Sequence, residues 1–455
     1  MPEGGRGGGG RAASRARSGS PGLGLVLGLG LPSLAAWVGL AAAGDLTRRV
    51  PLLFALYGAA FAGYAVLLAA TRWGERLDRR ALLAALALAL AFRAVMLAAP
   101  PSLSADVYRY LWDGRVFAAG VNPFRYPPTA PELEPLRDEH HSAINHHQLP
   151  TIYPATDQLV FLAVARIWPT PAGMKLAMGL FDLATLAALA GLLGVLGLPP
   201  GRLLVHAWCP LPILELSGMG HVDAIGIAFL VAAILALERQ RPRLALAALA
   251  AAILGKLMPV LLVPAFLARA SRRAWWVLVL ILAAGLLPFW HAGVDPTVAL
   301  RTFAAIWRGN DVAFAWLLKL ADGDLAAAKR FAAILTAAVA LACLRRRASP
   351  AATALAVLTA ALLLSPVLHP WYLTWLVPFL AVRPSASLVT WTGSVVFAYV
   401  AWTGFHAAGE YAVPLGVRAL ELGLPLATAA VGAAVQLRAM RPAPWREWRI
   451  DRSPI

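Results

Sequence analysis

Long apolar runs alternate with short polar segments along most of this 455-residue chain. A helix needs about 20 apolar residues to cross the roughly 30 Å hydrocarbon layer of a bilayer. Apolar runs of about this length, or somewhat shorter, lie at residues 23–44, 51–71, 81–100, 151–168, 171–197, 202–217, 222–237, 243–269, 274–290, 326–344, 350–367, 371–382, 386–406 and 414–437. The pattern predicts an all-α polytopic membrane protein with about 11 to 14 transmembrane helices.

Composition agrees with this interpretation. Mean hydropathy is +0.68, and charged residues make up 14% of the chain, whereas soluble domains carry about a quarter. The formal net charge of +17 comes from short basic clusters between apolar runs. A nucleic-acid-binding protein would carry one basic stripe instead, so we expect no such partner. Cys209 and Cys343 lie within apolar runs, which excludes a disulfide framework or a four-ligand zinc site.

The basic clusters also predict orientation, because cytoplasmic loops are enriched in Lys and Arg. The clusters at 72–80, 238–243, 269–273 and 344–349, with both ends of the chain, are expected in the cytoplasm. The predicted organisation is a disordered basic cytoplasmic tail at 1–22, N-terminal transmembrane helices at 23–100, a large extracytoplasmic loop at 101–150, a transmembrane helical core at 151–437 and a basic cytoplasmic tail at 438–455. The first run is interpreted as a retained span, since about 21 apolar residues exceed the core of a secretory signal.

One part of this topology needs a break in a helix. Residues 238–243 and 269–273 are both expected inside, yet one apolar run separates them. Gly255 and Pro259 would allow a broken or re-entrant pair of short helices, with Lys256 near the turn. The alternative is a single crossing followed by a weakly basic loop outside. We prefer the broken form.

The loop at 101–150 begins with a dense polar segment, SADVYRYLWDGRVFAAGVNPFRY. Helical spacing over residues 106–119 places four side chains on one face: Asp106, Arg109, Tyr110 and Asp113. Gly120 is suited to end this helix, and the Asn-Pro that follows predicts an extended or turning chain. We expect an amphipathic helix at the outer membrane surface with its charged face toward a cavity. A merely solvated surface helix is the alternative.

Further polar residues point to the same outer face. Four histidines follow in the loop, His140, His141, His146 and His147. They lack the i, i+4 spacing of helical metal ligands, so a structural or acceptor-contact role is preferred to a metal site. Polar residues within apolar runs are costly and often functional; here they are Glu215, His221, Asp223, Lys256 and His369, with Trp371 and Tyr372 beside the last. Helix–helix hydrogen bonds could satisfy each one, but together they predict one shared cavity.

Five segments in order resemble the GT-C superfamily of integral-membrane glycosyltransferases: DVYRYLWDGRVFAAGVNPFRYPP, INHHQLPTIYPATDQ, ELSGMGHVD, GKLMP and HPWYLTWLVPF. Over about residues 81 to 406, the chain is similar to the polyprenyl-phosphate-sugar-dependent mannosyltransferase-like group around glycosyltransferase family 87. The resemblance implies a GT-C type fold whose first large extracytoplasmic loop carries the catalytic base, here Asp106. Members often have Asp-x-Asp at this point, whereas this chain has Asp-Val-Tyr and its next acid at Asp113. This difference favours a metal-free mechanism without a cofactor; a divalent metal is the less favoured alternative.

Such a donor keeps its tail in lipid and its phosphate at the interface, so its enzyme needs an outward cavity, cations and a base. We expect Asp106 to deprotonate the acceptor hydroxyl while that oxygen displaces polyprenyl phosphate in line, with inversion. Candidates to bind the donor phosphate are Arg109, Arg115, Lys256 and His369. Candidates to contact the sugar, the acceptor or the lipid are Tyr110, Trp112, Asp113, Asn122, Tyr126, His146, Tyr153, Glu215, His221, Asp223, Trp371 and Tyr372.

The predicted function is transfer of a sugar, with mannose as the first candidate, to a lipid or glycan acceptor on the outer side of a bacterial inner membrane. Arabinose, glucose and galactose stay open, as do the linkage and the prenyl length. The main alternative is a multi-span transporter or flippase of a lipid-linked or sugar substrate. A ligase or phosphotransferase acting on a lipid-linked substrate is another. Release of free polyprenyl phosphate would distinguish the glycosyltransferase from both.

Overall fold

The computed structural model describes residues 22–290 and 294–439, so most of the two predicted tails lies outside the described residues. Within the described ranges the regular structure is helical, and β pairing is limited to one bridge between Gly309 and Val367. The all-α prediction is confirmed.

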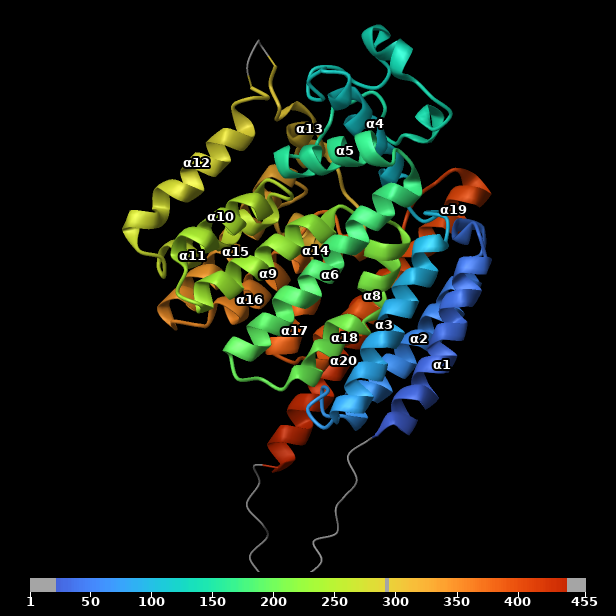
Figure 1. Cartoon of the computed structure of the whole chain (residues 1–455), viewed down its shortest axis with the longest axis vertical. Helices are drawn as coiled ribbons and strands as arrows, with labels where there is room; N and C mark the ends of the chain where they lie inside the picture. Colours follow the sequence, from blue (N-terminus) through green and yellow to red (C-terminus); the bar gives the residue numbers. More distant parts are fainter. Residues whose placement is uncertain (1–21, 291–293, 440–455) are drawn as a thin grey trace, which may run out of the picture.

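The helices follow one another in an order that matches most of the predicted runs (Figure 1). The α-helices are α1 (Leu23–Ala42), α2 (Val50–Ala70), α3 (Arg79–Ala98), α4 (Asp106–Ala118), α5 (Ala155–Ile167), α6 (Pro171–Val195), α7 (Leu204–Ala207), α8 (Pro210–Pro212), α9 (Asp223–Glu238), α10 (Pro242–Ile253), α11 (Val263–Leu267), α12 (Trp275–Leu286), α13 (Val298–Ile306), α14 (Val312–Leu320), α15 (Leu325–Arg345), α16 (Pro350–Leu363), α17 (Val377–Val382), α18 (Ala386–Ser394), α19 (Ala401–Ala408) and α20 (Leu415–Ala439). Between them lie the π-helix η5 (Ile213–Gly218) and 3-10 helices that include η6 (Met258–Leu262), η8 (Pro370–Trp375) and η9 (Val395–Val400).

Seven of the described helical segments are long and apolar enough to cross a membrane, which indicates a membrane protein. They are Leu23–Ala42, Val50–Ala70, Arg79–Ala98, Pro171–Val195, Leu325–Arg345, Ala386–Ala408 and Leu415–Gln436. Shorter apolar helices fill the bundle between them, at Pro242–Ile253, Met258–Leu267, Pro350–Leu363 and Pro370–Val382. The total of 11 to 14 crossings stays a prediction, because such short helices do not by length alone span the hydrocarbon layer.

Several regions differ from the predicted runs. The run at 202–217 is divided among α7, α8 and η5, and the run at 371–382 is divided between η8 and α17. The run at 151–168 forms α5, whose 13 residues give a length of only about 20 Å at 1.5 Å per residue, so this run is not a full-length span. The prolines at 150 and 154 keep the chain extended before α5. The segment between 294 and 325 contains α13 and α14, nine residues each, which the apolar pattern did not predict because neither fills a spanning window.

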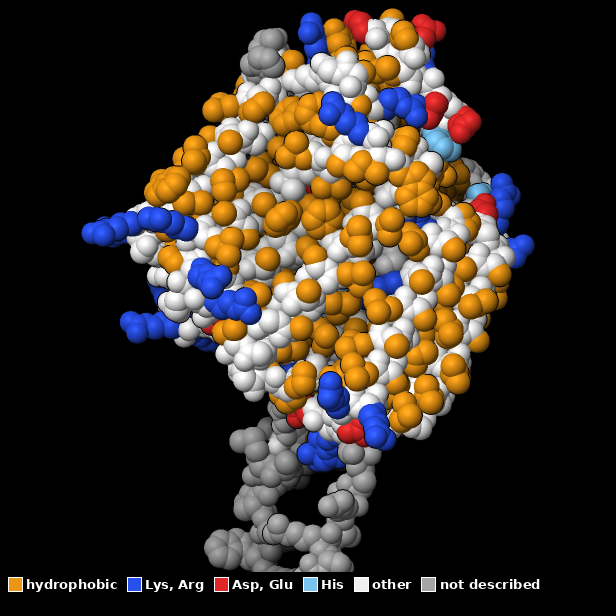
Figure 2. Space-filling model, viewed as in Figure 1, with side chains coloured by type: hydrophobic (Ala, Val, Ile, Leu, Met, Phe, Trp, Pro, Cys, Tyr) orange, Lys and Arg blue, Asp and Glu red, His pale blue; other side chains and the backbone are white. Residues whose placement is uncertain are grey.

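The break predicted near Gly255 is confirmed. α10 ends at Ile253 and the chain resumes as η6 at Met258, so Lys256 lies within the break. α11 contacts α10, while the placement of both basic clusters on one side of the membrane stays a prediction. Lys and Arg side chains lie at the left side and the bottom of the view, and others lie at the right edge and near the end that carries α4, α5 and the 101–150 loop (Figures 1 and 2).

Buried charges join α3 to α6 beneath that loop. Asp182 of α6 accepts a hydrogen bond from Arg93 Nε of α3 at 2.7 Å, and its other oxygen lies 2.7 Å from His206 Nε2. The Lys175 ammonium group of α6 donates to carbonyls at the C-terminal end of α3, including that of Met96 at 3.0 Å. Helix ends leave such carbonyls without partners, and an unpaired buried charge is costly. These contacts therefore hold the C-terminal part of α3 against α6.

Candidate active site

Asp106 is the first residue of α4, directly after the extended segment that follows α3. Its backbone N–H donates to the Ser104 hydroxyl at 3.2 Å, and its carboxylate lies at the helix end whose dipole favours an anion. The Asn145 side chain, from the far end of the loop, donates to Oδ1 at 2.6 Å. With 17% of its side chain exposed, Asp106 is oriented by the protein and remains open to a ligand.

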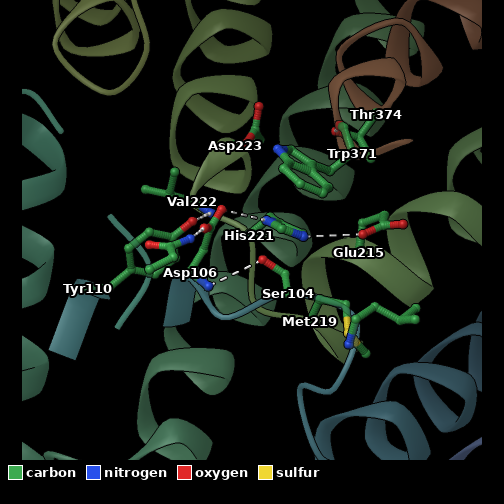
Figure 3. A network of polar contacts seen from close by, with 12 residues as sticks. Ser104, Asp106, Tyr110, Glu215, Met219, His221, Val222, Asp223, Trp371 and Thr374 are labelled. Atoms are coloured by element: carbon green, nitrogen blue, oxygen red, sulfur yellow. Dashed lines mark hydrogen bonds and ion pairs between the residues drawn. The ribbon is translucent and has the colours of Figure 1, made fainter. Parts of the chain in front are cut away.

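The ELSGMGHVD segment brings a histidine and a second acid toward Asp106 (Figure 3). Residues 213–218 form a π-helix, a conformation often found at functional sites, and Gly220 turns the chain with a φ of 77°. His221 Nδ1 lies 3.7 Å from Asp106 Oδ2, and its Nε2 lies 3.3 Å from Glu215 Oε2. Behind them, the Tyr399 hydroxyl lies 2.8 and 3.0 Å from the two Glu215 oxygens and donates to that carboxylate.

Trp371 is sandwiched between two histidines. Its ring centre lies 4.0 Å from that of His221 and 4.3 Å from that of His369, both nearly parallel. Two rings at these separations must occupy opposite faces of the indole. If the predicted contact of Trp371 were stacking on a sugar ring, a histidine would therefore have to move. In this structure Trp371 instead fixes the planes of the two imidazoles.

Lys256 reaches from its helix break to the first residue of α9. Its Nζ donates to Asp223 Oδ2 at 2.9 Å and lies 4.7 Å from the ring centre of Tyr372. The Trp375 indole N–H donates to Asp223 Oδ1 at 2.6 Å. A quarter of the Lys256 side chain is exposed. The structure thus brings together eight predicted residues: Asp106, Glu215, His221, Asp223, Lys256, His369, Trp371 and Tyr372.

The charged face predicted for α4 is only partly directed toward this cluster. Arg109 Nε donates to Asp113 Oδ1 at 2.9 Å, and both side chains are buried. The Thr151 hydroxyl donates to Asp113 Oδ2 at 2.5 Å. Burial raises the pKa of Asp113, although the positive charge of Arg109 opposes this shift. The pair joins α4 to the chain before α5, so the predicted contacts of Arg109 with phosphate and of Asp113 with sugar would need this pair to open.

Arg115 lies further along α4 and contacts the loop. It donates to the Leu136 carbonyl at 3.1 Å and forms an ion pair with Asp138. Partial burial acts to raise the pKa of Asp138, but the Arg115 hydrogen bond and charge outweigh it and lower that pKa. Arg115 therefore ties the loop to its helix. A role at the donor phosphate stays a prediction that this geometry does not favour.

The predicted tyrosines that follow Asp106 in the chain pack mainly against other side chains. Tyr110 is buried, with its ring centre 4.9 Å from those of Tyr153 and Phe161. Its hydroxyl accepts a hydrogen bond from the Val222 N–H at 3.5 Å, next to His221 in the chain. Tyr126 lies under the Arg125 guanidinium, 5.1 Å from it. Tyr110 thus supports the cluster through the backbone next to His221. Tyr126 packs within the loop.

Asn122, Trp112 and His146 also have packing partners. Asn122 donates to the Phe289 carbonyl at 2.9 Å and accepts from the Phe124 N–H at 3.0 Å, so it forms a turn. The ring centre of Trp112 lies 5.1 Å from that of His141, and that of His146 lies 4.7 Å from that of Trp307. Burial lowers the pKa of His146.

The loop histidines are spread over different neighbours. His140 packs against Tyr108 with ring centres 5.4 Å apart, and His141 Nε2 lies 3.1 Å from the Pro128 carbonyl. Among residues 22–290 and 294–439, no group of three or more His, Cys, Asp or Glu side chains is arranged to hold a metal ion.

Sequence reasoning missed three residues of the cluster. Ser104 and Asn145 both contact Asp106 and lie in polar segments that were already singled out, so a search for polar neighbours of the base could have found them. Tyr399 comes from the apolar segment η9. A single tyrosine in such a segment carries no signal that distinguishes it from a packing residue.

Comparison with known proteins identifies the family of the chain. A family model described as alpha-(1->6)-mannopyranosyltransferase, N-terminal domain, matches residues 26–272, more than half of the chain. The matched part includes Asp106, Glu215, His221 and Lys256, while His369 lies beyond it. No curated protein and no solved structure matches the chain. The match fits the mannosyltransferase-like group expected from the sequence, and the chain belongs to the MptA_B family of alpha-(1->6)-mannopyranosyltransferases.

Proposed function

We propose that this protein is an inverting glycosyltransferase that moves mannose from a polyprenyl-phosphate donor to a lipid or glycan acceptor, with Asp106 as general base. The family supports mannosyl transfer. The observation that carries the assignment of the base is a difference in exposure. Asp106 has 17% of its side chain exposed, whereas Glu215 and Asp223 are at 0% and 1%. Of the three acids, Asp106 is the one that an acceptor hydroxyl can reach.

The proposed reaction is a single displacement. Asp106 takes the proton of the acceptor hydroxyl, the hydroxyl oxygen bonds to the anomeric carbon, and the bond from that carbon to the phosphate oxygen breaks with its electron pair going to polyprenyl phosphate. Lys256 and His369 are the candidates to stabilise the charge that grows on the phosphate. Lys256 is the stronger one, because it is partly exposed and its partner Asp223 is also held by Trp375. No step of this mechanism needs a cofactor.

The linkage in the family description bears on the acceptor. An alpha-(1->6) mannosyl linkage forms when the attacking oxygen is a 6-hydroxyl. We therefore propose an acceptor that presents a primary sugar hydroxyl, such as a mannose-containing lipid or glycan.

We place the active site on the extracytoplasmic side of a bacterial inner membrane, with residues 101–150 as the catalytic loop and both chain ends in the cytoplasm. The support is the set of basic clusters between the apolar runs, at 72–80, 238–243, 269–273 and 344–349, because such enrichment is typical of cytoplasmic segments. Lys and Arg side chains lie at the left side and the bottom of the view, with some also near the loop (Figure 2). A polyprenyl-phosphate donor would then reach Asp106 and Lys256 from the outer leaflet.

The test is an assay in proteoliposomes with polyprenyl-phosphate mannose and a mannose-containing acceptor, which follows release of polyprenyl phosphate. Asp106→Asn keeps the size of the side chain but removes its basicity, so we expect a loss of roughly 100-fold or more. Glu134→Gln, on the exposed part of the same loop, is the matched control and should turn over normally. Equal rates for wild type and Asp106→Asn would refute the base assignment. If folded protein released no polyprenyl phosphate from any sugar of a panel, the transporter interpretation would gain support.

A further inference from the structure

Four titratable side chains lie in a row that leads from Asp106 into the protein. The order is Asp106, His221, Glu215 and Tyr399, and the first three are drawn in Figure 3. Successive separations are 3.7 Å from Oδ2 to Nδ1, 3.3 Å from Nε2 to Oε2 and 2.8 Å from Oε1 to the hydroxyl. Only the first member is exposed to any extent, because His221 is at 1% and Glu215 at 0%.

The imidazole of His221 is held so that its two nitrogens point along this row. Trp371 lies against its face, with 14° between the ring planes, which prevents the ring from tilting. Both nitrogens are buried and neither makes a hydrogen bond of normal geometry. A buried polar atom without a hydrogen bond is uncommon in folded proteins. Here such atoms point at two carboxylates, and in unliganded enzymes catalytic contacts are often long and tighten when substrate binds.

Glu215 selects one tautomer of that imidazole. Both of its oxygens accept from the Tyr399 hydroxyl, which holds the carboxylate in one orientation opposite His221 Nε2. Each imidazole nitrogen faces a carboxylate, and an ionised carboxylate can only accept. Nε2 is nearer to its carboxylate, at 3.3 Å against 3.7 Å for Nδ1, so we expect the proton of the neutral imidazole on Nε2. In neutral imidazole the proton on Nε2 leaves a lone pair on Nδ1, the atom that faces Asp106.

We propose that His221 is the proton acceptor behind Asp106: the proton taken from the acceptor hydroxyl passes through Asp106 to His221 Nδ1, with Glu215 and Tyr399 as positioning residues. This inference rests on the proposed function. The acceptor O–H bond breaks, a proton bonds to Nδ1, and Asp106 ends the step as a carboxylate. The positive charge of the imidazolium lies between two carboxylates, which stabilise it by Coulomb attraction.

Other charged groups near His221 do not reverse this argument. His369 lies beyond Trp371, on the opposite face of the indole from His221. The ammonium group of Lys256 is paired with Asp223, so its charge is largely balanced. The groups that face the two nitrogens of His221 are therefore Asp106 and Glu215.

The experiment separates proton transfer from simple positioning with two substitutions of His221. Gln places an amide near the position of Nε2, and Asn places one near Nδ1, so His221→Asn can still contact Asp106 but can accept no proton. We expect both variants to lower kcat roughly 10- to 100-fold with little change in KM. Glu215→Gln and Tyr399→Phe should have smaller effects in the same direction. His406→Gln, at a histidine whose Nε2 lies 2.9 Å from the Thr47 hydroxyl and outside this row, is the matched control and should keep the wild-type kcat.

If His221→Asn keeps nearly wild-type kcat, the imidazole only positions Asp106 and the proposal is overturned. A second measurement does not depend on turnover. Nitrogen-15 NMR of histidine-labelled protein in nanodiscs, with His221 assigned among the nine histidines by its loss in His221→Gln, reports which ring nitrogen carries the proton.

We expect the proton on Nε2 of His221 in the wild type and a loss of this preference in Glu215→Gln. A proton on Nδ1 in the wild type would overturn the proposal. Wild-type protein that released no polyprenyl phosphate would contradict the proposed function, and the tautomer measurement would still decide the arrangement of His221.

Discussion

A methyl group added at Gly226 should disturb the candidate active site through Trp375, the residue that holds Asp223. Gly226 lies within α9, one turn after Asp223, and a Cβ built on it would lie 2.5 Å from Cη2 and 2.9 Å from Cζ2 of Trp375. Trp375 is completely buried, and its indole N–H holds Asp223, the partner of Lys256. Gly226→Ala must therefore push the indole away from the carboxylate that anchors Lys256.

The expected magnitude follows from three opposing contributions. Ala in place of Gly inside a helix stabilises by up to about 1 kcal/mol. Overpacking of a buried ring costs about 1–3 kcal/mol, and loss of a hydrogen bond to a buried charged group costs about 1.5–3 kcal/mol. The net expectation for Gly226→Ala is a destabilisation of roughly 2–4 kcal/mol.

The assay is thermal unfolding of purified protein in detergent, combined with the KM for the polyprenyl-phosphate donor. Gly58→Ala is the matched control, because Gly58 is also inside a helix, α2, and a Cβ there would meet nothing within 4 Å. The control should be neutral or slightly stabilised, whereas Gly226→Ala should unfold at lower temperature and show a raised donor KM. Equal unfolding temperatures for the two variants would refute the reasoning.

Two further predictions concern residues outside the cluster. Asp182→Asn removes the charge shared by Arg93 and His206, so it should destabilise the protein by about 3–5 kcal/mol while the donor KM of the folded fraction stays unchanged; a raised KM without a fall in unfolding temperature would contradict this. The pKa of Asp138 is lowered by Arg115, so this ion pair stabilises the loop fully at pH values above the usual Asp pKa of about 3.9. The contribution is lost as the pH falls through the lower pKa of Asp138 in the folded state. Limited proteolysis of the loop should therefore become faster as the pH falls in the wild type. In Arg115→Met the rate should depend less on pH. A tenfold rise of the donor KM in Arg115→Met would show instead that Arg115 contacts the donor phosphate.

The sequence was sufficient for features that depend on local spacing. The apolar runs predicted α1, α2, α3, α6, α15 and α20 closely, because each is a single long helix that faces lipid over much of its surface. The amphipathic spacing at 106–119 predicted α4 to within one residue at its end. Gly255 and Pro259 correctly predicted a break, since neither residue favours the interior of a helix.

Features that depend on tertiary contacts could not be predicted in this way. Arg109 and Asp113 share a helical face with Asp106, yet Thr151 draws Asp113 into the interior, and this partner is 38 residues away in the chain. From the sequence, Trp371 is a candidate to contact a sugar. In the structure His221 and His369 cover the two faces of its indole. Periodicity assigns a side chain to a face of its own helix, but it does not say what packs against that face.

The candidate active site is built where helices begin and end, and this explains why so apolar a chain tolerates its polar residues. Asp106 and Asp223 are the first residues of α4 and α9, Lys256 lies between α10 and η6, and His369 directly precedes η8. Helix ends leave backbone groups unpaired, so water and polar ligands have partners there that the middle of a transmembrane helix does not offer. The geometry of the site therefore depends on the residues that break the helices as much as on the residues that carry charge. Gly220 illustrates this dependence, because its positive φ turns the chain directly before His221, whose Nδ1 lies 3.7 Å from Asp106 Oδ2.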